Sequence, residues 1–210
     1  TLAINAIASG AADYVLFHRA LHLPPGKYND NALTEASGAM QWMAPMGFFG
    51  AMPAIALAYN EYCQRYGATR EAMATLVSEA RKNGSRIPWS AWYQKPLTVE
   101  QYMAEEMIFE PMCRFDADMP VEGVACFVLT SAERARDLPH QPVYVSGFAS
   151  GYPTRNRAML HWTLDDMMEA GEGLSARLWE SSGLAASQID LPQLYDGFPP
   201  FVYIWLETLG

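Results

Sequence analysis

The sequence predicts a layered α/β fold that carries a mostly helical insertion. Buried-strand patterns occur at residues 13–21, 121–130 and 143–148, and helical patterns alternate with them, as in layered α/β proteins. Residues 27–112 differ in character, because they combine helical periodicities with a stretch rich in Gly, Met and aromatic residues. Half of the 210 residues are hydrophobic, which suffices for one large domain or two small ones.

The first elements are the end of a helix and a buried strand. Residues 3–9 have the pattern of a helix end, and Gly10 follows where a C-cap glycine is expected. Tyr14-Val15-Leu16-Phe17 is the expected centre of the strand that comes next. Because no Met precedes this helix end, we expect the chain to be a segment of a longer subunit.

The insertion contains three predicted helices with recognisable starts. Pro53 is placed to begin a helix that runs to Tyr66. Thr98 and Gln101 form a capping-box pair for a short third helix. Thr69 is placed to cap the second helix, whose apolar residues recur at helical spacing: Met73, Leu76, Val77 and Ala80.

The remainder of the chain predicts a second α/β unit. A short charged helix follows the strand of residues 121–130, and residues 138–142 have the composition of a linker. We therefore divide the chain into residues 1–137 and 138–210. The elements expected after this boundary are a strand at 143–148, a helix from Thr163 to about Ser182, a strand that ends at Tyr195 and an aromatic helix at 199–209.

Composition excludes several classes of protein. The formal charge of −9 argues against a nucleic-acid partner, because phosphate binding needs clustered basic residues. No apolar run reaches the roughly 18 residues that predict a membrane span. The three cysteines, Cys63, Cys113 and Cys126, are odd in number and irregularly spaced, which predicts neither a disulfide framework nor a zinc site and fits a reducing cytoplasm. Cys63 and Cys126 are expected to be small core residues.

The sequence predicts no metal site and no common catalytic motif. His18 and His22 are expected on and just beyond a strand, where they do not come together as an i, i+4 pair on a helix does. Asp116 and Asp118 lie in a loop without the Gly and distal Glu of a calcium loop, which predicts a solvated turn. No phosphate-binding Gly-rich loop and no Gly-x-Ser-x-Gly motif follows a strand.

Residues 40–52 combine methionines with aromatic residues and glycines. One interpretation is an irregular core patch, since Met fills gaps readily. The other is the wall of a pocket for a large apolar ligand. Both interpretations stay open, and the pocket interpretation assigns substrate contacts to Met43, Met46, Phe48 and Phe49.

The tetrapeptide Tyr195-Asp196-Gly197-Phe198 is the strongest candidate for a catalytic site. A short apolar run leads into it and the aromatic segment of residues 199–209 follows, which predicts a strand, a tight turn and a buried helix. Tyr195 then stands at the carboxyl end of a strand, where layered α/β folds place their chemistry. Gly197 allows close backbone approach. The alternative is a core tyrosine whose hydroxyl bonds to the backbone.

Four segments, taken in order, resemble the thiolase superfamily, in particular its sterol-carrier branch. They are residues 6–16, 62–69, 115–125 and 195–198. The last segment falls where sterol-carrier thiolases have His-Asp-Cys-Phe and other thiolases have Asn-Glu-Ala-Phe. Tyr-Asp-Gly-Phe is similar instead to the thiolase-like steroid side-chain aldolases, which are called lipid-transfer proteins. The resemblance spans essentially the whole chain, although subunits of this family are about twice as long.

The resemblance implies a layered α/β/α fold. Residues 1–137 would be the C-terminal part of a first thiolase-like half, with residues 27–112 as its helical loop domain. Residues 138–210 would begin the second half. The nucleophilic Cys of thiolases and their C-terminal Gly-His and Cys-Gly motifs correspond to no residue of this chain.

The resemblance also implies an enzyme, a carbon–carbon lyase. It would cleave a 17-hydroxy steroid-20-carboxyl-CoA thioester by a retro-aldol reaction into a 17-ketosteroid and propionyl-CoA. Tyr195 would be catalytic, and Gly197, Phe198 and the Met43–Phe49 region would contact the substrate. No cofactor is implied besides the CoA thioester itself. The implied partners are a second copy of the subunit and a small protein built of an OB-fold and a zinc ribbon.

Two other functions and two roles for the phenol remain open at this point. The chain could come from an acyl-CoA thiolase (an acetyltransferase), or from a non-catalytic lipid or acyl-CoA carrier. A free phenol is mostly protonated at neutral pH, so it donates readily to an oxyanion and needs a perturbing environment to act as a base. The sequence does not choose between these two roles for Tyr195.

Overall fold

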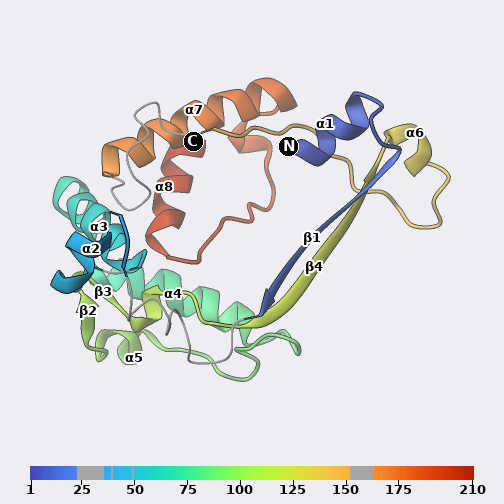
Figure 1. Ribbon diagram of the computed structural model, residues 1–210. Helices are drawn as coiled ribbons and strands as arrows, with labels where there is room; N and C mark the ends of the chain where they lie inside the picture. Colours follow the sequence, from blue (N-terminus) through green and yellow to red (C-terminus); the bar gives the residue numbers. More distant parts are fainter. Residues whose placement is uncertain (23–35, 39, 49, 152–162) are drawn as a thin grey trace. The chain divides into compact units, whose positions relative to one another are not determined.

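The computed structural model describes residues 1–22, 36–38, 40–48, 50–151 and 163–210, which form two compact units (Figure 1). Each unit is assembled from three separate stretches of the chain. The first unit comprises Thr1–Tyr28, Pro120–Gly151 and Gly173–Asp190, and the second comprises Asn29–Met119, Tyr152–Glu172 and Leu191–Gly210. The division at residue 138 into two thiolase-like halves stays a prediction.

The first unit is built around one pair of antiparallel strands, β1 (Tyr14–His22) and β4 (Glu122–Thr130), which lie side by side in Figure 1. Their register is regular from Tyr14 opposite Thr130 to His22 opposite Glu122. Two helices and a 3-10 turn complete the unit, together with the C-terminal part of α7 (Leu164–Ser182): α1 (Leu2–Ala8), α6 (Ala132–Ala135) and η4 (Ala186–Gln188). Both predicted strands are thus confirmed.

The predicted burial of these two strands is wrong. Most side chains of β1 and β4 are exposed, including Phe17 and Phe127, whose rings stack at 6.3 Å. Cys126, expected in the core, is exposed on β4. Among the described residues the sheet has only these two strands, so side chains on its two faces stay accessible.

The strands expected at residues 143–148 and before Tyr195 do not form among the described residues. A strand needs a neighbour for its backbone N–H and C=O groups, and β1 and β4 pair only with each other. Residues 143–148 are instead held at their end by α7, because the Phe148 amide donates to Ser181 Oγ at 3.0 Å. A Cβ on Gly147 would lie 2.6 Å from the Ser182 backbone N, so this contact requires glycine.

The second unit is mostly helical, as the sequence predicts for the insertion. Thr69 Oγ1 accepts from the Ala72 amide, and Thr98 and Gln101 form the predicted reciprocal capping box. Gly67, with φ 71°, ends the helix that Pro53 begins. The elements of this unit besides the start of α7 are α2 (Met40–Met43), η2 (Ala44–Met46), α3 (Met52–Tyr66), α4 (Arg70–Gly84), α5 (Val99–Met103), β2 (Met107–Phe109), β3 (Met112–Cys113), η3 (Arg114–Asp116) and α8 (Pro200–Leu209).

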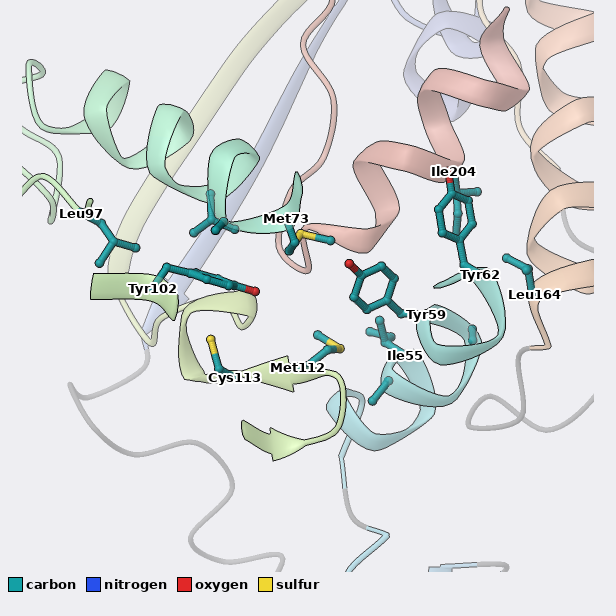
Figure 2. Close-up of a cluster of buried hydrophobic side chains, with 14 residues drawn as sticks. Ile55, Tyr59, Tyr62, Met73, Leu97, Tyr102, Met112, Cys113, Leu164 and Ile204 are labelled. Carbon is teal, nitrogen blue, oxygen red and sulfur yellow. The ribbon is translucent and has the colours of Figure 1, made fainter. Parts of the chain in front are cut away.

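The core of the second unit joins helices that are far apart in the sequence (Figure 2). Helices α3 and α4 supply its centre, and the short strand β3, the start of α7 and helix α8 complete it. The labelled side chains in Figure 2 are Ile55, Tyr59, Tyr62, Met73, Leu97, Tyr102, Met112, Cys113, Leu164 and Ile204. This tightly packed core holds helix α8 in place, and with it the residues at the start of the helix.

Asp116 is fully buried, which corrects the prediction of a solvated turn. The single Tyr102 hydroxyl donates to this carboxylate and lies 2.7 and 2.8 Å from its two oxygens, and the Cys113 amide donates to Asp116 Oδ2 at 2.8 Å. Burial raises the pKa of Asp116, and these hydrogen bonds oppose that rise. The two donors satisfy a carboxyl group that would otherwise be costly to bury.

Candidate active site around Tyr195

The turn that carries Tyr195 is fixed by the helix that follows it. Pro199 and Pro200 begin α8, and proline at a helix start is preorganised for the helical φ angle. The Phe201 amide donates to the Phe198 carbonyl, and the Val202 amide donates to the Pro199 carbonyl, both at 2.9 Å. The backbone just after Gly197 is therefore held in one conformation.

Helix α8 is in turn anchored in the core. Val202, Ile204 and Thr208 are buried, and the Tyr203 ring stacks on Tyr62 at 5.6 Å with an angle of 15° between the planes. Thr208 packs directly on Gly171 of α7, where an added Cβ would lie 2.7 Å from Thr208 Oγ1. Helix α8 thus gives the turn a rigid support.

Tyr195 lies on this support and is exposed. The residue is 60% exposed, and the centroids of the Tyr195 and Phe201 rings are 6.1 Å apart. Phe201 packs edge-on against Phe198 at 6.2 Å. Among the described residues, none forms a hydrogen bond with the Tyr195 hydroxyl. The alternative of a buried core tyrosine bonded to the backbone therefore does not describe Tyr195.

Gly197 lies directly beneath the Tyr195 phenol. A Cβ built on Gly197 would be 2.1 Å from Tyr195 Oη and 2.4 Å from Tyr195 Cζ. Distances below 3.0 Å do not occur for real Cβ atoms. The phenol and a side chain at position 197 therefore compete for the same space.

The other described residues predicted to contact the substrate lie on different segments of the second unit. Phe198 is partly buried against the core, beside the turn. Met43 ends α2 and is partly buried, whereas Met46 in η2 is 87% exposed. The Phe48 amide donates to the Met43 carbonyl at 3.2 Å, and Phe49 lies outside the described residues. The substrate contacts of these residues stay predictions.

A tyrosine cluster beside α8 was missed by the sequence reasoning. Tyr59 and Tyr62 of α3 pack on Tyr203 of α8, and Tyr62 Oη donates to the Glu207 carboxylate. Burial raises the pKa of Tyr59 and of Tyr62, so these phenols stay protonated at neutral pH. The i, i+3 spacing of Tyr59 and Tyr62 on a predicted helix is the signal that could have found the pair. Their role is structural.

No group of three His, Cys, Asp or Glu side chains able to hold a metal ion occurs in the part of the chain that the structure describes. All three cysteines are free, with Cys113 buried and Cys63 partly buried. Within the same residues, no helix combines the length and the apolar character needed to cross a membrane.

Curated relatives match almost the whole chain. It is 32% identical over 219 aligned positions to a steroid side-chain-cleaving aldolase of Thermomonospora curvata. It is 31% identical over 218 positions to a 17-hydroxy-3-oxo-4-pregnene-20-carboxyl-CoA lyase of Mycobacterium tuberculosis. Each match covers 99% of this chain but 56% of the relative, so the chain spans little more than half the length of these proteins. No protein-family model matches the chain.

Solved structures give the fold. An Ltp2-ChsH2(DUF35) aldolase superposes with a TM-score of 0.81 at 29% identity, over 98% of this chain and 54% of that one. A monomeric SCP2-thiolase-like protein of Mycobacterium smegmatis superposes with a TM-score of 0.70 at 22% identity, over 97% of this chain and 43% of that one. The chain has a thiolase-like fold. Its homologues are thiolase-like proteins that include steroid side-chain-cleaving aldolases, which confirms the resemblance and the mixed α/β class predicted from the sequence.

Within this thiolase-like fold, the turn from Tyr195 to Phe198 combines three properties of a reaction site. It presents an exposed phenol, it is supported by a helix buried in the core, and it lies beside the aromatic side chains of Phe198 and Phe201. A phenol and an apolar surface are thus held on one rigid element.

Proposed function

We propose that the chain carries the catalytic tyrosine of an aldolase, a carbon–carbon lyase that cleaves the side chain of a 17-hydroxy steroid CoA thioester. The products would be a 17-ketosteroid and propionyl-CoA. The observation that carries the proposal is the exposed Tyr195 phenol on its fixed turn. The similarity to a steroid side-chain-cleaving aldolase and to a 17-hydroxy-3-oxo-4-pregnene-20-carboxyl-CoA lyase supports the choice of substrate.

The proposed reaction is a retro-aldol cleavage. The 17-hydroxyl loses its proton, the C17–O bond becomes a carbonyl, and the C17–C20 bond breaks. The electron pair of that bond passes to C20 and forms the enolate of the thioester, which then takes up a proton to give propionyl-CoA. The thioester carbonyl accepts the electrons, so the reaction needs no cofactor besides the CoA thioester substrate.

The proposal leaves two roles for Tyr195 in this step. As a base, the Tyr195 oxygen accepts the proton of the 17-hydroxyl. As a protonated donor, the Tyr195 phenol gives a hydrogen bond to the oxyanion that develops. Both roles require the Tyr195 hydroxyl at the reacting end of the substrate.

The apolar ring system of the substrate would lie against Phe198 and the stretch that contains Met43, Met46, Phe48 and Phe49. Phe198 is partly buried beside the turn, which gives it a fixed surface to offer. Aromatic and Met side chains are the usual lining of sites for large apolar ligands. Gly197 would leave room for the reacting end of the substrate.

The proposal includes partners and a cellular location. We propose a homodimer that acts with a small protein built of an OB-fold and a zinc ribbon, and the similarity to an Ltp2-ChsH2(DUF35) aldolase supports a protein partner. The three free cysteines fit a reducing cytoplasm, which is the proposed location.

The test is product analysis by mass spectrometry. The full-length protein is incubated with a 17-hydroxy steroid side-chain CoA thioester, with and without the OB-fold partner. A 17-ketosteroid and propionyl-CoA in equal amounts are expected. Acyl exchange with free CoA and no cleavage would assign the chain to an acyl-CoA thiolase instead. Binding without either product would leave a lipid or acyl-CoA carrier.

A further inference from the structure

The Tyr195 side chain folds back over its own turn. Its hydroxyl oxygen, Cζ and Cε2 all lie within 3.0 Å of the place where a Cβ on residue 197 would stand. The phenol therefore occupies the volume that any side chain at position 197 would need. This arrangement exists because residue 197 is glycine.

The backbone does not require glycine at position 197. Among the residues that the structure describes, the glycines with positive φ are Gly10, Gly38, Gly47, Gly50, Gly67, Gly183 and Gly210, and Gly197 is not one of them. An alanine at position 197 is therefore compatible with a negative φ, and the three atoms nearest to its Cβ all belong to Tyr195.

The ring is the part of this pair that can move. Tyr195 is 60% exposed and its hydroxyl has no hydrogen-bond partner among the described residues, whereas the backbone after Gly197 is fixed by the start of α8. A methyl group at position 197 would thus turn the phenol away into solvent and leave the helix in place.

We infer that Gly197 is a positioning residue for the Tyr195 phenol, and that the Tyr–Gly pair works as one unit. This inference rests on the proposed function for its effect on catalysis, but the spatial coupling stands on geometry alone. It differs from the role assigned above to Gly197, which is to leave room for the substrate. The two roles predict different kinetics.

Gly197→Ala distinguishes the two roles through the split between kcat and KM. If Gly197 positions the phenol, kcat falls by about 10- to 100-fold with little change in KM, because a displacement near 1 Å can cost about 100-fold. If Gly197 only admits the substrate, KM rises and kcat is preserved. Gly123→Ala is the matched control, because Gly123 also lacks a positive φ and has no atom within 4 Å of its Cβ position.

A second readout does not depend on activity. The full-length protein carries 3-fluorotyrosine at position 195 alone, and its ¹⁹F NMR signal is compared in the parent, the Gly197→Ala variant and the Gly123→Ala variant. We expect the signal to shift only in Gly197→Ala, with the thermal unfolding temperature unchanged or raised.

An unchanged fluorine signal in Gly197→Ala would overturn the inference. A shifted signal with unchanged kcat would also overturn it, provided that Tyr195→Phe is inactive. If the parent protein shows no cleavage at all, the proposed function fails, while the fluorine signal still decides whether Gly197 positions the phenol.

Discussion

Two tyrosines of the second unit, Tyr102 and Tyr195, lie in opposite environments. Tyr102 is 1% exposed, and its hydroxyl donates to the carboxylate of the buried Asp116. Tyr195 is 60% exposed, and no described residue bonds to its hydroxyl. Burial raises the pKa of Tyr102, so that phenol serves as a permanent donor inside the core. Packing thus commits the Tyr102 phenol to stability and leaves the Tyr195 phenol accessible for the proposed chemistry.

The largest effect is expected when the Tyr195 hydroxyl is removed. Tyr195→Phe is expected to lower kcat by about 100- to 10,000-fold, the range for losing a proton-transferring group, with little change in thermal unfolding. Steady-state kinetics on the full-length protein measure the effect. Tyr144→Phe is the control, because Tyr144 is 58% exposed and carries no assigned role. Full activity of Tyr195→Phe would refute the assignment.

Removal of the buried hydroxyl should give the opposite result. Tyr102→Phe removes one donor to Asp116 and leaves the Cys113 amide as the other donor described above. A buried polar group that loses a hydrogen-bond partner lowers the free energy of unfolding by about 1–3 kcal/mol. We expect the free energy of unfolding in urea to fall by that amount. Tyr144→Phe should change it by less than about 0.5 kcal/mol. If Tyr102→Phe lowered the free energy of unfolding as little as Tyr144→Phe does, the stabilising role of the Tyr102 hydroxyl would be refuted.

The support beneath Tyr195 can be tested at two glycines of one helix. Gly171→Ala in α7 would drive a methyl group into Thr208 of α8, and we expect a net loss of up to about 2 kcal/mol after the gain in helix propensity is subtracted. Gly173→Ala meets only Arg177 Nη2 at 3.9 Å and should stabilise the helix by about 0.5–1 kcal/mol. Thermal unfolding of both variants decides the matter, and the same sign for both would contradict the close packing of α7 on α8.

The smallest effect concerns pH. Burial raises the pKa of Asp116, so the folded state holds this proton more strongly than the unfolded chain, where Asp has a pKa near 3.9. The contribution of Asp116 to stability is therefore full below about pH 4 and is lost as the pH rises through the folded pKa, with a slope of at most about 1.4 kcal/mol per pH unit. Asp116→Asn should flatten the slope. An equal slope in that variant would assign the pH dependence to other groups.

Features set by a few neighbouring residues could be predicted from the sequence. The caps at Thr69 and Thr98 depend on side chains three residues away, and both form as expected. The strand at 143–148 depends on a neighbouring strand, and none pairs with it among the described residues. The burial of Asp116 likewise depends on Tyr102, fourteen positions earlier, which no local pattern encodes.

At the candidate site, too, the sequence predicted the local feature but not the contact that depends on packing. The sequence indicated Tyr195 through its place between an apolar run and an aromatic helix, and the exposed phenol agrees with that position. It could not indicate that the ring lies over Gly197, because that contact depends on the side-chain rotamer and on the start of α8. Side-chain orientation at a turn is decided by packing, which one-dimensional patterns do not contain.

The hydrogen bond between Tyr62 and Glu207 joins residues 145 positions apart. We expect contacts so distant in sequence to form late in folding, since the chain must close a long loop before it gains their energy. Helix α8 joins the core of its unit only when this loop closes, and the turn at Tyr195 is then fixed in the same step. If the proposed function holds, activity should therefore appear only after helix α8 has docked.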